Sequence, residues 1–305
     1  MNQVFELTII GSNSAVSTFD RFPTAQILQI QNQFILIDCG EGTQFRLDKF
    51  GIKKSAIDFI FISHLHGDHY FGLIGLLTSY NLSGRISPLH LFGPAGLKEI
   101  IDLQLKYNGA ELRYTLFFQA TTIEGNRPLF SNELFEVSSF PLKHRIDTTG
   151  FLFSEKPSVR RIKKEKIEHF GLSVEDIVSI KAGNSFISED GHEIEAEEFL
   201  RPIIKPRSYA FCSDTKYFEE LAEIVQHVTC LYHEATFETE KEHLAEKTMH
   251  STARQAALTA KNADVGRLLI GHFSSRYKDL SLLLGEARAV FRNTDLATEG
   301  EKYEL

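Results

Sequence analysis

The sequence predicts an α/β fold with mixed sheets, layered as α/β/β/α, and a charged segment that interrupts the regular order. Strand-like and helix-like stretches alternate along the chain, and the strands come in runs with helices interspersed. From about residue 155 to residue 190 charged residues dominate, after which the alternation resumes. With 305 residues, 42% of them hydrophobic, the chain can build one large domain with a sizeable core.

The first half begins with strands and then alternates. Strands are predicted over Val4–Ile10, Ala25–Ile30, Phe34–Ile37, Phe59–Ile62, Leu89–Phe92, Thr115–Thr122 and Leu134–Pro141. The second and third resemble a hairpin around the polar Gln31–Gln33. Helices are predicted over Thr43–Phe50, from about Phe71 to Tyr80, and from Gly96 to about Tyr107. Phe59–Ile62 is continuously apolar, which is typical of a strand with both faces covered.

The second half resumes after the charged segment. Strands are predicted over Ser208–Cys212, Cys230–Glu234 and Arg267–Ile270, with helices over Glu219–Gln226 and Ser251–Lys261. No internal repeat and no low-complexity segment interrupts this order. We therefore expect a single domain over residues 1–305, with an inserted segment at about 155–190.

Composition excludes several classes of protein. Cys39, Cys212 and Cys230 are odd in number and lack CxxC spacing, so buried small side chains are expected rather than disulfides or a thiolate zinc site. The first twenty residues contain no Lys or Arg, and no apolar run approaches the ~18 residues of a membrane span. A cytoplasmic protein without a membrane partner is expected. The net charge of −8 argues against a surface uniformly covered in cations, although a local basic patch remains compatible with it.

Four possible metal ligands follow the buried strand directly, in the run His64-Leu65-His66-Gly67-Asp68-His69. Alternate side chains at a strand end face the same way, so His64 and His66 can bind one ion together. A turn at Gly67 would direct Asp68 and His69 to a neighbouring site. Imidazole and carboxylate ligands suit Zn²⁺, Mn²⁺ or Fe better than Ca²⁺. A solvated His-rich turn is the alternative, and the further candidate ligands argue against it.

Those further candidates are His144, Asp214 and His272, each of which follows a predicted strand. Any one of them alone would be an ordinary loop residue. Seven ligands together suit two ions with three or four ligands each, one shared carboxylate and a water between them. Two cations lower the pKa of such a water and stabilise the charge of an in-line attack at phosphorus.

Several motifs resemble one family closely. HLHGDH is similar to the HxHxDH signature of the metallo-β-lactamase superfamily, which many hydrolases share. More selective matches to ribonuclease Z lie in Ile37–Leu47 (IDCGEGTQFRL), Phe61–Leu77 (FISHLHGDHYFGLIGLL), Leu142–Arg145 (LKHR), Phe211–Thr215 (FCSDT), His233–Thr236 (HEAT), His250–Thr252 (HST) and Gly271–Tyr277 (GHFSSRY). They span nearly the whole chain, in order and at family-like spacing.

The resemblance implies a metallo-β-lactamase fold with a protruding arm and an endoribonuclease that removes the 3′ trailer of precursor tRNA, leaving a 3′-hydroxyl on the tRNA. It implies two Zn²⁺ per subunit, with Mn²⁺ or Fe as alternatives, and a homodimer. One zinc would be held by His64, His66 and His144, the other by Asp68, His69 and His272, with Asp214 bridging. Asp68 would also orient or deprotonate the bridging water.

The resemblance further implies that His250 protonates the departing ribose 3′ oxygen and that Glu234 orients it. A leaving alkoxide needs a proton, and a His–Glu contact fixes the tautomer and raises the basicity of the imidazole. From the residues alone, His250 could equally be a helix-start residue beside a cap at Ser251 or Thr252. The remaining histidines are expected to be structural, core or surface residues: His90, His169, His192, His227, His233 and His243.

The charged segment opens with a local reversal of sign. Its cations are Lys156, Arg160, Arg161, Lys163, Lys164 and Lys166, against Glu165 alone. A solvated loop is the ordinary interpretation of a charge run. The ribonuclease Z arm, which clamps the tRNA elbow, falls at this place, so these cations and Lys181 are predicted to contact tRNA phosphates. One departure stands out: the stretch GLSVEDIVSIKAGNSF has Lys181 and Gly183 but lacks the proline common in such arms.

Two other functions remain open at this stage. The same metal site would serve a phosphodiesterase for small nucleotides or esters, since fold does not fix substrate. A catalytically silent RNA-binding subunit is the third possibility, although all seven ligands and His250 are present. The identity of the metal, the preferred precursors and the response to a 3′-CCA end are not fixed by the sequence.

Overall fold

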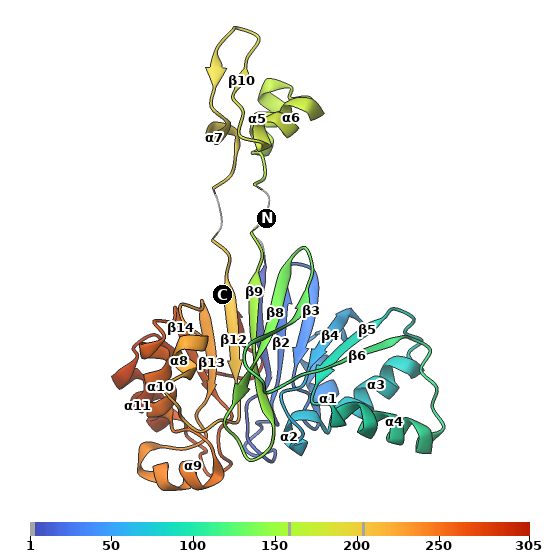
Figure 1. The fold of residues 1–305 in the computed structure, drawn as a ribbon, viewed down its shortest axis with the longest axis vertical. Coiled ribbons are helices and arrows are strands. Elements are labelled where there is room, and N and C mark those ends of the chain that lie inside the picture. Colours follow the sequence, from blue (N-terminus) through green and yellow to red (C-terminus); the bar gives the residue numbers. More distant parts are fainter. Residues whose placement is uncertain (1–3, 158–159, 203–204) are drawn as a thin grey trace. The chain divides into compact units, whose positions relative to one another are not determined.

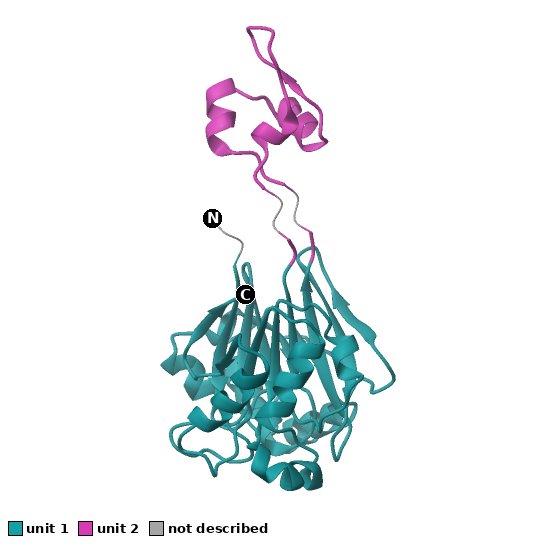
Figure 2. Cartoon of the chain, turned by 90° about the vertical axis from the view of Figure 1, so that its left-hand side faces the viewer, with its two compact units in different colours: residues 1–155, 207–305 teal, residues 156–206 magenta. Residues whose placement is uncertain are grey.

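The computed structural model describes residues 4–157, 160–202 and 205–305. The chain forms two compact units (Figure 2). The main unit comprises residues 1–155 and 207–305, and the inserted unit comprises residues 156–206. The inserted unit extends beyond the predicted 155–190 segment, because residues 193–200 close its core.

The first large sheet of the main unit holds the N-terminal strands. Its order is β16 (Lys302–Glu304), β1 (Phe5–Gly11), β2 (Ala25–Ile30), β3 (Gln33–Ile37), β4 (Ile57–Phe61), β5 (Leu89–Gly93) and β6 (Leu116–Ala120). The strands β16, β1, β2 and β3 pair antiparallel, and β3 to β6 pair parallel. The sheet is therefore mixed, as the sequence predicted.

The second large sheet holds most of the remaining strands. Its order is β15 (Thr294–Leu296), β14 (Arg267–Gly271), β13 (Cys230–Glu234), β12 (Ser208–Cys212), β9 (Thr148–Glu155), β8 (Phe135–Leu142) and β7 (Arg127–Ser131). The strands β12 to β15 are parallel, and β9 is antiparallel to both β8 and β12. Consequently β8, β12, β13 and β14 run in the same direction, and their carboxyl ends meet at one edge.

Helices cover the outer face of each sheet (Figure 1). On the first sheet these include α1 (Thr43–Lys49), α3 (Leu73–Leu82) and α4 (Gly96–Asn108), and on the second α8 (Leu221–Ile224), α10 (Ala253–Asn262) and α11 (Ser281–Val290). Aromatic side chains such as Phe61, Phe151 and Tyr232 fill the core between the sheets. The α/β/β/α class predicted from the sequence is confirmed.

The strand β9 shows why some elements escape sequence patterns. Its burial is nearly continuous on both faces, so it lacks the alternation that marks a half-exposed strand. It also contains Gly150, where a Cβ would lie 2.3 Å from the Phe140 ring. Any other residue at this position would collide with that ring. The short or terminal elements β7, β15, β16, α11 and α9 (Glu242–Thr248) are likewise not predicted from sequence.

The inserted unit has its own small core. It contains α5 (Lys164–Phe170), α6 (Val174–Lys181), the pair β10 (Phe186–Ile187) and β11 (Glu193–Ile194), and α7 (Ala196–Phe199). Ile162, Ile180 and Phe199 are buried together at its centre. Ser173 and Asp176 form a capping box at the start of α6, so the proline-free stretch of the sequence is a well-capped helix.

Candidate metal centre

Side chains able to bind metal gather where strands of the main unit end. The motif His64–His69 follows β4, and the short helix α2 (Gly67–Tyr70) begins within it; His144 follows β8, Asp214 follows β12, Glu234 ends β13 and His272 follows β14. Asp214 and His272 have left-handed backbones, with φ of 59° and 56°. Such conformations are uncommon outside glycine and concentrate at functional sites.

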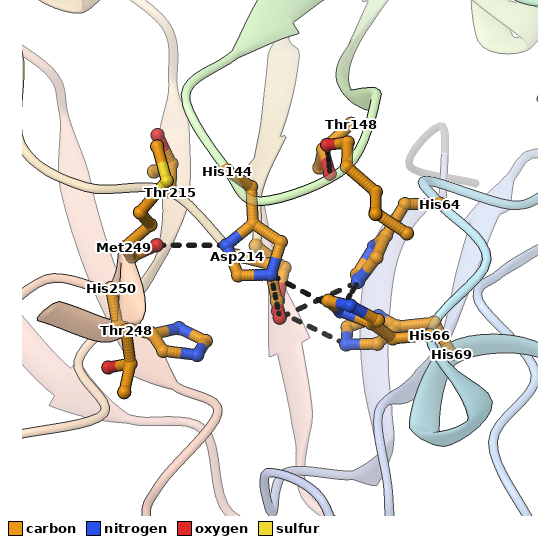
Figure 3. A network of polar contacts seen from close by, with 12 residues as sticks. His64, His66, His69, His144, Thr148, Asp214, Thr215, Thr248, Met249 and His250 are labelled. Atoms are coloured by element: carbon orange, nitrogen blue, oxygen red, sulfur yellow. Dashed lines mark hydrogen bonds and ion pairs between the residues drawn. The ribbon is translucent and has the colours of Figure 1, made fainter.

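The first group consists of His64, His66, His144 and Asp214, whose ligand atoms all lie within 4.8 Å of one another. His66 Nδ1 is 3.0 Å from His64 Nε2 and 3.2 Å from His144 Nε2. The Oδ2 atom of Asp214 lies 3.6 Å from His64 Nε2 and 3.5 Å from His144 Nε2. Figure 3 shows these imidazoles converging on the Asp214 carboxylate.

The second group consists of Asp68, His69 and His272. Asp68 Oδ2 lies 3.6 Å from His69 Nε2 and 3.5 Å from His272 Nε2. The other oxygen of Asp214, Oδ1, lies 3.1 Å from His69 Nε2 and 3.0 Å from His272 Nε2. Asp214 therefore directs one oxygen to each group, which is the geometry of a carboxylate shared by two ions.

The chemistry of these donors fits a pair of divalent cations. Burial lowers the pKa of His64 well below its ordinary value and also lowers the pKa of His66 and His144, so these rings are neutral with free lone pairs. The buried Nε2 atoms of His69 and His272 both face Asp214 Oδ1, at 3.1 Å and 3.0 Å, but among the described residues neither makes a hydrogen bond of regular geometry. A buried imidazole nitrogen without a partner is unfavourable unless a ligand binds it.

The surrounding carboxylates also require positive charge. Burial raises the pKa of Asp214, but the neighbouring His272, His69 and His64 outweigh burial and hold it well below its usual value. Burial lowers the pKa of His69, and Asp214, Asp68 and Asp38 outweigh it and raise that pKa well above 6.5. Several buried carboxylates around one imidazole create a strongly negative potential, which a bound cation would neutralise.

Asp38 positions two of the candidate ligand side chains through buried hydrogen bonds. The sequence patterns did not single it out. Its Oδ2 atom accepts hydrogen bonds from His69 Nδ1 at 2.6 Å and from Ser63 Oγ at 2.9 Å. Ser63 Oγ also contacts His64 Nδ1 at 3.0 Å. One buried carboxylate thus orients a ligand of each group. Asp38 directly follows β3, so the rule that found Asp214 after a strand could also have found it.

His250 and Glu234 form a second polar pair beside the ligands. His250 Nδ1 lies 2.8 Å from Glu234 Oε1. Glu234 is fully buried and also accepts from the backbone N–H of Thr215 at 2.7 Å and of Ser251 at 3.1 Å. Burial lowers the pKa of His250, but the charge and hydrogen bond of Glu234 outweigh it and raise the pKa to about 9. His250 is therefore protonated at neutral pH.

Further contacts fix two ligand rings. Thr236 Oγ1 lies 3.0 Å from His272 Nδ1 and donates to Glu234 Oε2 at 2.5 Å, so Glu234 also acts on His272 through a hydroxyl. His144 Nδ1 donates to the Met249 carbonyl at 2.9 Å (Figure 3), which leaves its Nε2 free to bind a metal. Neither Thr236 nor Met249 was predicted, because only the folded chain brings them to their partners.

Members of both groups line a cleft of about 420 Å³. Its walls include His66, Asp68, Asp214, His250 and His272. The remaining lining residues are Ser14, Ala15, Pro23, Glu41, Gly67, Phe71 and Arg145. The backbone N–H of Ala15, another lining residue, donates to Asp68 Oδ2 at 2.7 Å and so holds that carboxylate at the cleft wall.

The remaining histidines and the cysteines are not part of the ligand groups formed by the described residues. His233 is buried and contacts the Glu234 carbonyl at 2.7 Å through Nδ1. None of His90, His169, His192, His227, His233 and His243 belongs to a metal-binding group in the described part of the chain. Cys39, Cys212 and Cys230 are buried free thiols, which confirms their predicted character.

The predicted tRNA-binding cations lie in the inserted unit, and several have partners there. Arg160 pairs with Glu197 through both terminal guanidinium nitrogens, and Lys163 donates to the Glu198 carbonyl at 2.8 Å. Lys164 lies 3.5 Å from Glu168, and Lys166 lies 3.9 Å from Glu198. Arg161 and Lys181 are exposed, and no ion pair engages them or Lys156 among the described residues.

The same chain fold recurs in known proteins. The short form of human tRNase Z superposes with a TM-score of 0.71 at 25% identity, over 98% of each chain. The metallo-β-lactamase fold protein YhfI of Bacillus subtilis gives 0.70 at 18% identity, over 99% of this chain and 100% of that one. A family model described as Anti-Pycsar protein Apyc1 matches residues 5–162, which include His64–His69 and His144 but not the later site residues.

Sequence relatives cover the whole chain. Ribonuclease Z of Cytophaga hutchinsonii is 45% identical over 300 residues, covering 98% of this chain and 96% of the relative. Ribonuclease Z of Bacteroides thetaiotaomicron is 41% identical over 295 residues, covering 97% and 93%. Ribonuclease Z of Porphyromonas gingivalis is 38% identical over 303 residues, covering 99% of both. The predicted resemblance is confirmed: this chain belongs to the ribonuclease Z family, hydrolytic endoribonucleases on a metallo-β-lactamase fold.

Proposed function

We propose that the protein removes the 3′ trailer of precursor tRNA, cutting after the discriminator base and leaving a 3′-hydroxyl on the tRNA. The observation that carries this proposal is the position of His250, paired with Glu234 at 2.8 Å beside a carboxylate whose two oxygens face two ligand groups. This arrangement joins a cation-binding centre to a proton donor, and cleavage that releases a ribose oxygen needs both.

His64, His66 and His144 would hold one divalent cation, and Asp68, His69 and His272 the other, with Asp214 shared between them. The donor set of imidazoles and carboxylates favours Zn²⁺, and Mn²⁺ or Fe would also fit. Bound cations of this kind lower the pKa of a water towards neutrality and stabilise negative charge developing at phosphorus.

The protein side chains position the reactants and move protons. Asp68, which accepts a hydrogen bond from the Ala15 N–H, orients or deprotonates the attacking water. His250 gives its proton to the departing 3′ oxygen of the tRNA ribose. Glu234 holds the His250 ring and keeps it protonated near neutral pH. A protonated imidazole of this kind typically contributes ~10²–10⁴-fold to the rate.

The inserted unit supplies the substrate preference. Its exposed cations Arg161 and Lys181, with Lys156, would contact tRNA phosphates, while the ion pair with Glu197 occupies Arg160. Double-stranded RNA is recognised through shape and phosphates, so cations suffice for this role. A small-molecule phosphodiesterase would have little use for such a unit.

We further propose a homodimer, in which the inserted unit of one copy serves the centre of the other, and a location in the cytoplasm. The family resemblance supports both. In the described residues no helix is long and apolar enough to cross a membrane. Light scattering at micromolar concentration tests the dimer, with a monomeric mass as the contradicting result.

The decisive experiment incubates metal-loaded protein with a precursor tRNA carrying a 3′ trailer. Metal content is measured first, with about two ions per chain expected. The cut is then mapped, and polyadenylation of the product tests for a 3′-hydroxyl. Cleavage after the discriminator base, abolished in His66→Ala and retained in His243→Ala, supports the proposal.

Two results would contradict it. A protein that holds two ions, leaves precursor tRNA intact and hydrolyses cyclic nucleotides would be a small-nucleotide phosphodiesterase. A protein that binds precursor tRNA but cleaves neither substrate would be a silent RNA-binding subunit.

A further inference from the structure

Phe71 places an exposed aromatic ring at the mouth of the metal centre. Its side chain is 62% exposed and lines the cleft together with His66, Gly67 and Asp68. Exposed hydrophobic residues are common on protein surfaces and need no explanation one by one. Phe71 is unusual because its ring borders a cleft otherwise lined mainly by charged and polar side chains. An exposed apolar ring at such a site is suited to contact an apolar part of a bound ligand.

The metal-binding motif itself holds the ring at this position. The Phe71 backbone N–H donates to the Gly67 carbonyl at 2.9 Å, which closes the turn of α2. A Cβ on Gly67 would lie 2.2 Å from the nearest Phe71 ring atom, so the ring rests directly on the Gly67 backbone. Tyr70 meets the ring edge-on, with centroids 5.1 Å apart. The ring is therefore supported from behind and open towards the cleft.

The cleft has chemically different sides. Phe71 follows α2, whereas His250 follows α9, on the other side of the centre (Figure 1). Arg145 follows the ligand His144 and is exposed at the cleft. The proton donor and the Phe71 ring thus come from different sides of the centre.

These positions assign directions to a bound RNA strand. The proton donor must face the leaving 3′ oxygen, which belongs to the last tRNA nucleotide. The tRNA body therefore leaves the centre on the side of His250. The first trailer nucleotide lies on the other side of the scissile phosphate, and so on the Phe71 side of the centre.

We propose that Phe71 forms a stacking platform for the base of the first trailer nucleotide. The inference rests on the proposed cleavage of precursor tRNA and names the subsite that binds its trailer. Single-stranded bases are commonly bound by stacking on aromatic rings, a contact that tolerates every base because each has a π face. Such a platform fits an enzyme that must accept trailers of any sequence.

The magnitude follows from stacking on exposed rings. Removing one aromatic platform weakens binding of a single-stranded base by roughly 5- to 150-fold. Phe71→Ala is therefore expected to lower kcat/KM on a precursor with an ordinary trailer by roughly that factor. Phe71→Trp, which keeps a flat ring, should stay within about threefold of the parent.

The test is a cycle of two enzymes and two substrates. The parent and Phe71→Ala are compared on a precursor tRNA with a normal first trailer nucleotide and on one with an abasic residue there. The proposal expects the loss caused by Phe71→Ala to vanish on the abasic substrate. Equal rates of the two enzymes on that substrate would also show that the variant has an intact metal centre.

A loss that persists in full on the abasic substrate overturns the proposal, because a merely structural role of Phe71 would act on both substrates alike. So does a loss that vanishes only when the discriminator base is removed. Phe45→Ala removes an even more exposed phenylalanine, 71% accessible and outside the cleft lining, and should match the parent. Failure of the parent to cleave either precursor would instead refute the proposed function itself.

Discussion

Glu234→Gln tests whether His250, kept protonated by Glu234, donates the proton that the leaving 3′ oxygen of the tRNA receives. The change removes the negative charge beside His250 while keeping the size of the side chain. Burial, which by itself lowers the pKa of His250, remains, so that pKa should fall from about 9 to 6.5 or below. The difference corresponds to about 3 kcal/mol of stabilisation of the imidazolium.

The expected effect grows with pH. A proton donor acts only while protonated, so activity falls as pH rises through its pKa. At pH 8 a group with a pKa of 9 is mostly protonated, whereas roughly one in thirty is protonated with a pKa of 6.5. Glu234→Gln should therefore lose ~30-fold or more in kcat/KM at pH 8 and recover as pH falls. The test compares the pH profiles of the two proteins loaded with the same metal.

The assay measures single-turnover cleavage of precursor tRNA between pH 5.5 and 9.5. A second substrate carries sulfur in place of the leaving 3′ oxygen. A thiolate departs without protonation, so the losses of Glu234→Gln and His250→Ala should largely disappear on it. A Glu234→Gln loss that is constant with pH, or that persists on the sulfur substrate, would refute the role of this pair.

Folding must be checked in parallel. The Glu234 carboxylate accepts from the Thr215 and Ser251 backbone N–H groups, and a glutamine NH₂ group can accept from neither. That mismatch destabilises the fold by about 1–3 kcal/mol. Metal content and the thermal midpoint of the variant separate this effect from the loss of the proton. Glu238→Gln, a nearby acid paired with Lys241 instead, is the matched control.

Three further predictions rest on other contacts. Asp38→Asn removes the charge that holds a ligand imidazole at 2.6 Å and should weaken metal binding ~10- to 100-fold, measured by competition with a chelator; unchanged affinity would contradict its positioning role. Arg161→Ala should raise KM for precursor tRNA and reduce the salt dependence of binding by about one phosphate contact, whereas Arg160→Ala, already paired, should have a smaller effect on that dependence. Gly150→Ala should destabilise the fold by about 1–3 kcal/mol in urea denaturation, because its Cβ meets a phenylalanine ring at 2.3 Å. Gly285→Ala, in open space within α11, is its control and should stabilise by about 0.5–1 kcal/mol.

The sequence by itself determined the features that depend on neighbouring residues. Four candidate ligands stand together in the run His64–His69 because one strand end and one turn carry them. His144, Asp214 and His272 could be predicted because each follows a hydrophobic strand, and carboxyl ends of strands with a common direction meet at one edge. The layered fold followed from the order of strands and helices.

Tertiary structure decided how distant groups share charge and hydrogen bonds. Only the folded chain directs one oxygen of Asp214 to each ligand group. The left-handed backbone at Asp214 could not be predicted from a sequence pattern. It also brings Asp38 to His69, and pairs Arg160 with Glu197 so that a basic run in the sequence is partly neutralised in space. Electrostatic energies depend on distance and burial, and between residues far apart in the chain the fold alone sets both.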